Sequence, residues 1–148
     1  MAQIIQNPDP ANLQRQLEQK SFEINYFKNQ ASEMQNQLQI LQKVIQDLDA
    51  TQQSLTVTDE LTRGTLLPLG AGVYAKAKTE KTGTVLIDVG GRVLVEKKPD
   101  EATIIIQERK ATAEKNLREI GGAFESVLQR IDQLTMQAEQ MARQAENQ

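Results

Sequence analysis

Two long runs of apolar residues, spaced alternately by three and four positions, limit most strongly what this chain can fold into. No Gly or Pro interrupts residues 11–55, and a helix of that span is roughly 68 Å long at 1.5 Å per residue. This spacing is the heptad repeat of a coiled coil, whose narrow apolar stripe requires a partner helix. The first run comprises Leu13, Leu17, Ile24, Phe27, Ala31, Met34, Leu38, Leu41, Ile45, Leu48 and Leu55.

The second run supplies the partner helix. It begins after Pro99 and keeps the same spacing to the end of the chain. When the two runs are aligned antiparallel, they match in length. The polar residues that interrupt one run then face apolar residues of the other. Facing pairs in this register include Leu17 with Met141, Ala31 with Val127, and Leu48 with Lys110. The chain is therefore predicted to form an antiparallel coiled coil from its own two ends.

Helix boundaries are marked by short polar signals. Asp9 is expected to cap the first helix, with Pro10 at the first helical position. Asp100 is expected to cap the second helix. We divide the chain into an N-terminal helix over 10–56, a connector with strands over 57–99, and a C-terminal helix over 100–147.

A glycine pair, Gly121-Gly122, lies inside the second predicted helix. Two such glycines cost about 2 kcal/mol relative to two alanines. One interpretation is close helix packing near Met34 and Gln37. The other is a flexible point that lets the coil bend.

The segment between the helices alternates apolar and polar residues, which is typical of strands. Gly70-Ala71-Gly72 and Gly90-Gly91 have the form of turns, so we expect two β-hairpins in series. The strands are predicted over 66–69, 73–79, 85–89 and 93–96, after a polar connector over 56–63.

These strands are expected to lack cover within their own chain. The helices bury their stripes on each other, an isolated hairpin is marginal in water, and a four-stranded sheet has two open edges. Strands from other chains would complete the sheet, most naturally as a closed barrel. The residues predicted to mediate this oligomerisation are Leu66, Leu67, Leu69, Val73, Ala75, Ala77, Val85, Ile87, Val89, Val93 and Val95.

Composition argues against several kinds of function. The chain has no Cys and no His, which removes thiol chemistry, the commonest general base and the commonest metal ligand. Its carboxylates are spread along helix surfaces, so no catalytic residues, metal site or cofactor are predicted. The net charge is −3 and basic residues are not clustered, which speaks against nucleic acid as a partner. Without a long apolar run or a signal-peptide pattern, we expect a soluble, cytoplasmic protein that does not enter membranes.

The chain resembles the prefoldin α subunits of archaea, a family also called GimC. The resemblance covers nearly the whole chain and is carried by LLPLGAGVYAKAK at Leu66–Lys78 and VLIDVGGRVLVEKK at Val85–Lys98, with the heptads on either side. It implies an α+β fold in which two β-hairpins join a long antiparallel coiled coil and assemble into an intersubunit β-barrel.

The same resemblance implies an ATP-independent holdase, built from two α and four β prefoldin subunits. Such a chaperone holds unfolded client proteins at the tips of its coiled coils and passes them to a group II chaperonin.

A loosely packed coil end suggests how the tips would bind clients. Fraying would expose apolar side chains there, and Met adapts to varied surfaces. The predicted client-binding residues are Leu13, Leu17, Ile24, Leu134, Met136, Ala138 and Met141. The competing interpretation is that these residues are only coil core. A further alternative for the whole protein is a structural coiled-coil tether or a filament-forming, prefoldin-like subunit that binds no clients.

Overall fold

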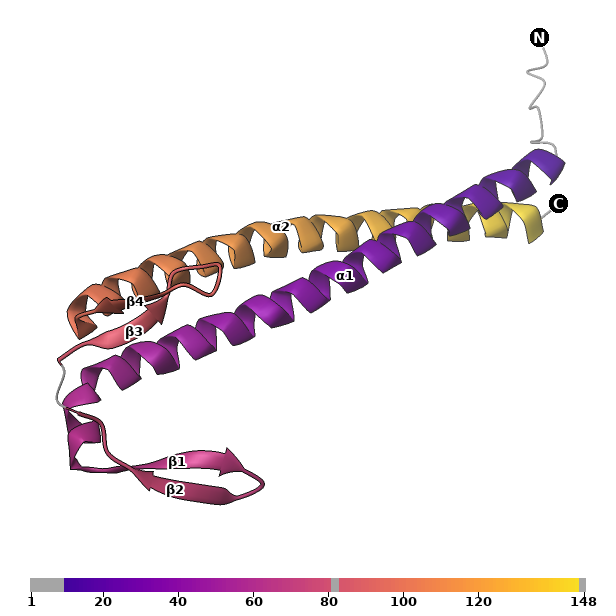
Figure 1. The fold of residues 1–148 in the computed structure, drawn as a ribbon. Helices are drawn as coiled ribbons and strands as arrows, with labels where there is room; N and C mark the ends of the chain where they lie inside the picture. Colours follow the sequence, from indigo (N-terminus) through magenta and orange to yellow (C-terminus); the bar gives the residue numbers. More distant parts are fainter. Residues whose placement is uncertain (1–9, 81–82, 147–148) are drawn as a thin grey trace, which may run out of the picture. The chain divides into compact units, whose positions relative to one another are not determined.

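The computed structural model describes residues 10–80 and 83–146 of the 148-residue chain. Along the chain lie a long helix, a short 3₁₀ helix, four strands and a second long helix (Figure 1). The described residues divide into two compact units. The first contains residues 10–40 and 117–146, and the second contains the described residues of 41–116.

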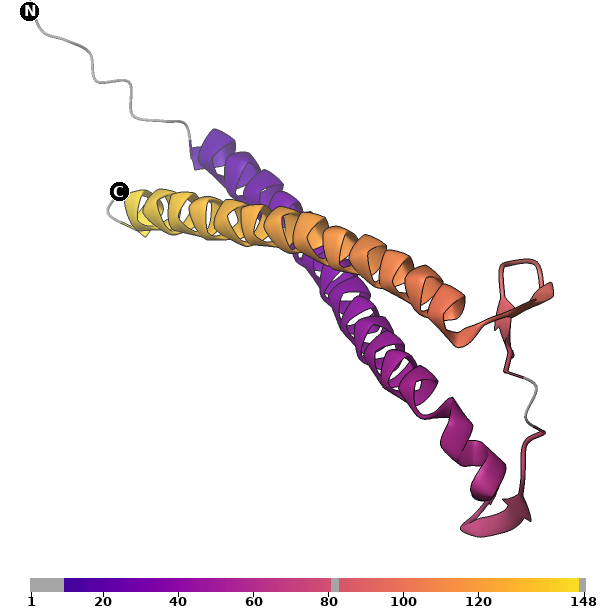
Figure 2. The same cartoon turned by 90° about the vertical axis from the view of Figure 1, so that its left-hand side faces the viewer.

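The two predicted long helices are present. Helix α1 spans Pro10–Thr56, and helix α2 spans Pro99–Glu146. In the first unit, the start of α1 and the end of α2 lie at the same end, as an antiparallel pair requires (Figures 1 and 2). Helix α1 begins at Pro10, in agreement with the prediction, whereas its predicted cap Asp9 lies outside the described residues.

Helix α2 begins one residue earlier than predicted. Pro99 occupies its first turn, and the Ala102 backbone N–H donates to the Lys98 carbonyl at 2.9 Å. The carboxylate of Glu101 accepts a hydrogen bond from the Lys98 N–H at 3.2 Å. Lys98 is thus the capping residue, and the prediction that Asp100 caps the helix is wrong. Proline favours the first helical position because its fixed φ suits the helix and its missing N–H costs no bond there.

The apolar stripes of both helices are buried at predicted positions in the first unit. Leu13 and Ala31 of α1 are buried, as are Val127 and Leu134 of α2. Ala31 and Val127 face each other in the predicted register, and both are among the least exposed side chains of the unit. This core is a single seam of small and medium side chains, as the scarcity of aromatic residues leads one to expect.

The register is also supported in the second unit, by a contact between the two helices. The Lys110 ammonium on α2 lies 2.5 Å from Oδ1 of Asp49 on α1, and 3.8 Å from the Glu114 carboxylate one turn along α2. Lys110 is predicted to face Leu48, the neighbour of Asp49, so this contact agrees with the predicted antiparallel alignment. A charged residue at a core position is accommodated because a carboxylate reaches it from the facing helix.

The strands form two separate antiparallel hairpins. In the first, β1 (Thr65–Gly70) pairs with β2 (Val73–Ala77), and in the second, β3 (Val85–Asp88) pairs with β4 (Leu94–Lys97). The predicted polar connector contains a 3₁₀ helix, η1, over Thr58–Arg63. Because the hairpins do not join into one sheet, each strand keeps one open edge, and there are four open edges rather than the predicted two.

The turn of the second hairpin is centred one residue later than predicted. Gly91 and Arg92 both have positive φ, and the Val93 N–H donates to the Gly90 carbonyl at 3.1 Å. Two central residues with positive φ match the right-handed twist of a hairpin. Val89 and Val93, predicted as strand residues, therefore lie outside β3 and β4 at the base of the turn, where the Val89 N–H donates to the Val93 carbonyl at 3.0 Å.

The glycine pair does not interrupt α2, which continues through Gly121 and Gly122. A Cβ atom built at either position would meet nothing within 4 Å. The interpretation that these glycines allow close packing near Met34 and Gln37 is therefore wrong for this chain. The interpretation as a flexible point remains a prediction.

Replacing both glycines with alanine should stabilise the protein. G121A/G122A is expected to raise the free energy of unfolding by about 2 kcal/mol, because alanine loses less backbone entropy and no neighbour obstructs its methyl group. Urea unfolding followed by circular dichroism, at matched protein concentration, measures the change. Ala123→Gly in the same turn is the control and should lower stability by about 1 kcal/mol. A decrease for G121A/G122A would show that these glycines have a packing partner.

The Lys110 contact predicts a loss of stability at alkaline pH. The hydrogen bond that the Lys110 ammonium donates to Asp49, assisted by the charges of Asp49 and Glu114 and opposed by burial, raises the pKa of Lys110 above its ordinary value. The stabilisation is therefore complete below the pKa of lysine in the unfolded chain, about 10.4, and disappears as pH rises through the higher pKa of the folded protein.

Unfolding measured at pH 8 and in steps above pH 10.4 should show the parent protein approaching the stability of Lys110→Gln only in the alkaline range. Asp49→Asn removes the acceptor and should weaken this pH dependence. An equal difference between parent and Lys110→Gln at every pH would contradict the assignment.

Candidate functional site

The β1–β2 hairpin has no buried side chain. Leu67 pairs with Ala75 on one face, and Leu66 pairs with Lys76 on the other. Leu66, Leu67, Leu69, Val73 and Tyr74 are all exposed. Fully burying one such side chain contributes about 1.5–3 kcal/mol, so a partner surface on either face of this hairpin would stabilise it substantially.

The β3–β4 hairpin is covered on one face only. Ile87 is 8% exposed and packs in a cluster with Ala102 and Ile106 of α2. Leu48 and Leu55 of α1, with Val85 and Ile105, pack around this cluster. The strands were expected to lack cover within their own chain because the helices have little apolar surface left for a sheet, and for one face of this hairpin that expectation is wrong.

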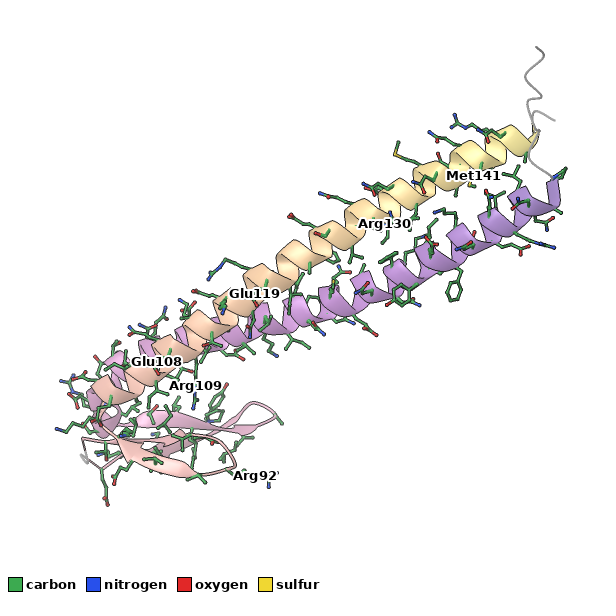
Figure 3. All side chains as sticks on the ribbon, turned by 90° about the horizontal axis from the view of Figure 1, so that it is seen from above. Arg92, Glu108, Arg109, Glu119, Arg130 and Met141 are labelled. Carbon is green, nitrogen blue, oxygen red and sulfur yellow. The ribbon has the colours of Figure 1, made fainter. Side chains whose placement is uncertain are left out.

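One polar contact joins the β3–β4 hairpin to α2, and another links its two strands. The Arg109 guanidinium of α2 donates a hydrogen bond to the Asp88 carbonyl, and Arg109 lies on the part of α2 beside the β3–β4 hairpin (Figure 3). The Thr84 hydroxyl lies 2.6 Å from a carboxylate oxygen of Glu96 and donates to it.

The opposite face of β3–β4 points to solvent. Leu86 pairs with Glu96, Asp88 pairs with Leu94, and both leucines are exposed. This face combines apolar and acidic side chains. The Leu66 face of β1–β2 instead combines apolar and basic side chains. It carries Tyr74 and Lys76 and lies next to Lys78 and Arg63. Both hairpins therefore present apolar surface together with open strand edges.

Most of the predicted oligomerisation residues are accessible. Leu66, Leu67, Leu69, Val73, Val89 and Val93 are exposed, Ala75, Ala77, Val85 and Val95 are half-buried, and Ile87 is buried. Ile87 and its neighbours serve the subunit's own core. Sequence reasoning missed Tyr74, Leu86 and Leu94 because it followed only one face of β2, β3 and β4. The same alternation, read for the other face, contains the signal.

The predicted client-binding residues all lie in the first unit. Leu13 is buried and Leu134 is 0% exposed, whereas Leu17, Ile24, Ala138 and Met141 are half-buried. Met136 is the exception, with 62% of its surface exposed. Among these predicted residues only Met136 is exposed in the closed coil, and Leu13 and Leu134 become available only if the helix ends separate. Met141 lies near the end of α2 (Figure 3).

An exposed aromatic pair on α1 was not anticipated from the sequence. Phe22 and Tyr26 are one helical turn apart and are 75% and 59% exposed. They lie off the heptad stripe, so a search for core positions does not select them. The chain has only three Phe and two Tyr residues, and two of these are exposed next to each other on α1.

Other site classes are not found in the part of the chain that the structure describes. No group of His, Cys, Asp and Glu side chains among these residues is placed to hold a metal ion. No described helix combines the length and apolar character needed to span a membrane.

Comparison with known proteins decides the family. The profile of the prefoldin family, described as "Prefoldin subunit", matches residues 22–144. The chain belongs to the prefoldin family. It is a member of a family of chaperone subunits, and its α+β fold of two long helices and two hairpins agrees with that membership.

Individual prefoldins are similar over much of the chain. The prefoldin subunit alpha of Methanobrevibacter smithii is 29% identical over 133 residues, which cover 87% of this chain and 89% of the relative. That of Thermofilum pendens is 34% identical over 82 residues, which cover 54% of this chain and 64% of the relative. A chain of the cryo-EM structure of filamentous PFD from Methanocaldococcus jannaschii has the same fold, with a TM-score of 0.66 and 19% identity. That match covers 76% of this chain and 95% of the other.

The solvent-facing leucines of β3–β4 should be needed for assembly and not for the fold of the subunit. We expect L86S/L94S to leave helix content unchanged and to shift the oligomer towards monomer, because both side chains are exposed in the isolated chain. Native mass spectrometry measures the assembly state. Ile87→Ala is the contrasting variant, since it should lower the stability of the subunit itself by about 2–5 kcal/mol. An unchanged oligomer for L86S/L94S would show that this face is not an interface.

Proposed function

We propose that this prefoldin subunit is part of an ATP-independent holdase that captures unfolded proteins at the ends of its coiled coil. The observation that carries the proposal is the combination of two hairpins with uncovered apolar surface and a two-helix coil that needs no further partner. The hairpins would build the body of the complex, and each coil would project from it as an arm.

Assembly with prefoldin β subunits is the arrangement that we propose for the body. Two copies of this chain contribute eight strands. Four β subunits with one hairpin each would contribute the same number, which is enough for two closed eight-stranded barrels. Closure is favoured because it removes every open strand edge, and open edges promote aggregation.

Client capture would use the far end of the coil. Leu13, Leu17 and Ile24 of α1 would act together with Leu134, Met136, Ala138 and Met141 of α2. The small side chain of Ala138 gives that end of the seam little apolar area, so local separation of the helices costs less free energy there than in a leucine-rich coil. Separation would expose leucine and methionine side chains, which adapt to irregular apolar segments.

Delivery to a group II chaperonin and residence in the cytoplasm complete the proposal. A holdase without nucleotide chemistry must release its client by transfer to a partner, and the mutual affinity of client and chaperonin would provide the driving force.

Removal of the coil ends tests where clients bind. Deleting residues 1–17 and 134–148 should leave the hairpin-built oligomer intact and abolish suppression of the aggregation of a chemically denatured test protein. Light scattering follows aggregation at a one-to-one ratio of oligomer to client, and native mass spectrometry confirms the assembly. If the truncated oligomer protects the client as well as the parent does, clients bind elsewhere.

Self-assembly into a tether or filament is the second candidate function. The observation in its favour is that the β1–β2 hairpin presents Lys76 and Lys78 beside apolar side chains, while the outward face of β3–β4 presents Asp88 and Glu96. Such a pair of unlike faces on one chain permits head-to-tail contacts between copies, which form rings or filaments. Native mass spectrometry of the chain without β subunits separates the two candidates, and a tether would leave the denatured client to precipitate at its normal rate.

A further inference from the structure

The outer face of α1 in the first unit carries the exposed aromatic pair Phe22 and Tyr26. This face lies opposite the heptad stripe, so the pairing of α1 with α2 does not cover it. The Tyr26 ring rests edge-on against Phe27, with ring centroids 5.4 Å apart. Tyr26 is thereby held in place, which reduces the entropy that a partner must remove on binding.

Two opposite charges flank the pair at equal spacing. Arg15 lies seven residues before Phe22, and Glu33 lies seven residues after Tyr26. Seven residues are about two turns, or roughly 10 Å along the helix, so both charges share the face of the rings. Both side chains are exposed, and among the described residues neither has an ion-pair partner.

This arrangement is complementary to itself. If a second copy of the face is laid antiparallel about the level of Ile24, each Phe22 meets the other copy's Tyr26. In the same alignment each Arg15 meets the other copy's Glu33, and the contact occurs twice. A two-fold axis produces this kind of interface, in which one patch serves both partners.

We infer that the outer face of α1 around Phe22 and Tyr26 is a docking surface for the same face of a second copy of this chain, in antiparallel alignment. The choice of a second copy rests on charge complementarity. A client segment of one charge sign would pair with either Arg15 or Glu33, whereas a second copy pairs with both.

The contact is expected to be weak for a single pair of chains. A few turns of helix bury less surface than the roughly 1,200 Å² that the smallest stable interfaces need. Two arms of one oligomer joined to two arms of another would bind more tightly, because the second contact forms at high effective concentration. The inference therefore predicts reversible association of whole oligomers, separate from assembly through the hairpins.

Sedimentation velocity of the full-length protein, in the oligomer that it forms, tests the inference over a range of concentrations. The parent should associate further as concentration rises. F22S/Y26S should weaken this association by about tenfold or more, because aromatic anchors dominate such contacts. Native mass spectrometry at low concentration should give the same hairpin-built oligomer for every variant.

Charge reversal makes the test specific. Arg15→Glu alone places two carboxylates opposite each other, and Glu33→Arg alone places two guanidinium groups opposite each other, so each variant should lose self-association. A mixture of the two single variants should associate again, because every facing pair is then of opposite sign. The double variant R15E/E33R should self-associate like the parent. Lys28→Glu, an exposed reversal on another face of α1, is the matched control and should have no effect.

Three results would overturn the inference. The first is a parent oligomer that does not associate further at any concentration. The second is a mixture of Arg15→Glu and Glu33→Arg that remains dissociated. The third is loss of client protection by F22S/Y26S with unchanged self-association, which would assign the face to clients. The first two results do not concern aggregation suppression, and the third requires that the parent protects clients, so failure of this inference is distinguishable from failure of the proposed holdase function.

Discussion

The narrow apolar seam between α1 and α2 is the constraint on which the other features depend. Each helix offers one stripe, and small side chains such as Ala31 and Ala113 leave little apolar area beyond it. The seam is sufficient to pair the helices but not to enclose a sheet on both faces. As a result, one hairpin is covered on one face by the helices, and the other has no buried side chain.

This division of apolar surface explains how a chaperone subunit can combine a stable fold with accessible binding surface. Ile87, Ala102 and Ile106 anchor β3–β4 to its own subunit, while Leu86 and Leu94 on the opposite face remain available. In the first unit Leu13 and Leu134 are closed into the seam, whereas Met136 is exposed. The surface that we propose for assembly is therefore already exposed in the subunit, whereas the buried leucines proposed to bind clients would become accessible only by local separation of the helices.

Much of the architecture was predictable because it rests on local periodicity. The heptad spacing predicts both helices and their antiparallel register, which the contact between Lys110 and Asp49 supports. Alternation and glycine positions predict the two hairpins. The errors in element boundaries lie where a single backbone hydrogen bond decides the boundary, as with Lys98 at the start of α2 and with Gly91 and Arg92 in the second turn.

The sequence by itself determined the helices, the hairpins and the family, because these depend on residue spacing that any three-dimensional arrangement must respect. Only the tertiary structure decided which strand faces are covered, since that depends on whether Ile87 reaches Ala102 and Ile106 across residues distant in sequence. It likewise decided that Gly121 and Gly122 have open space around them. The exposure of Phe22 and Tyr26 also depends on the tertiary structure. A residue outside the heptad pattern can still be buried if another element packs over it, and none does so here among the described residues.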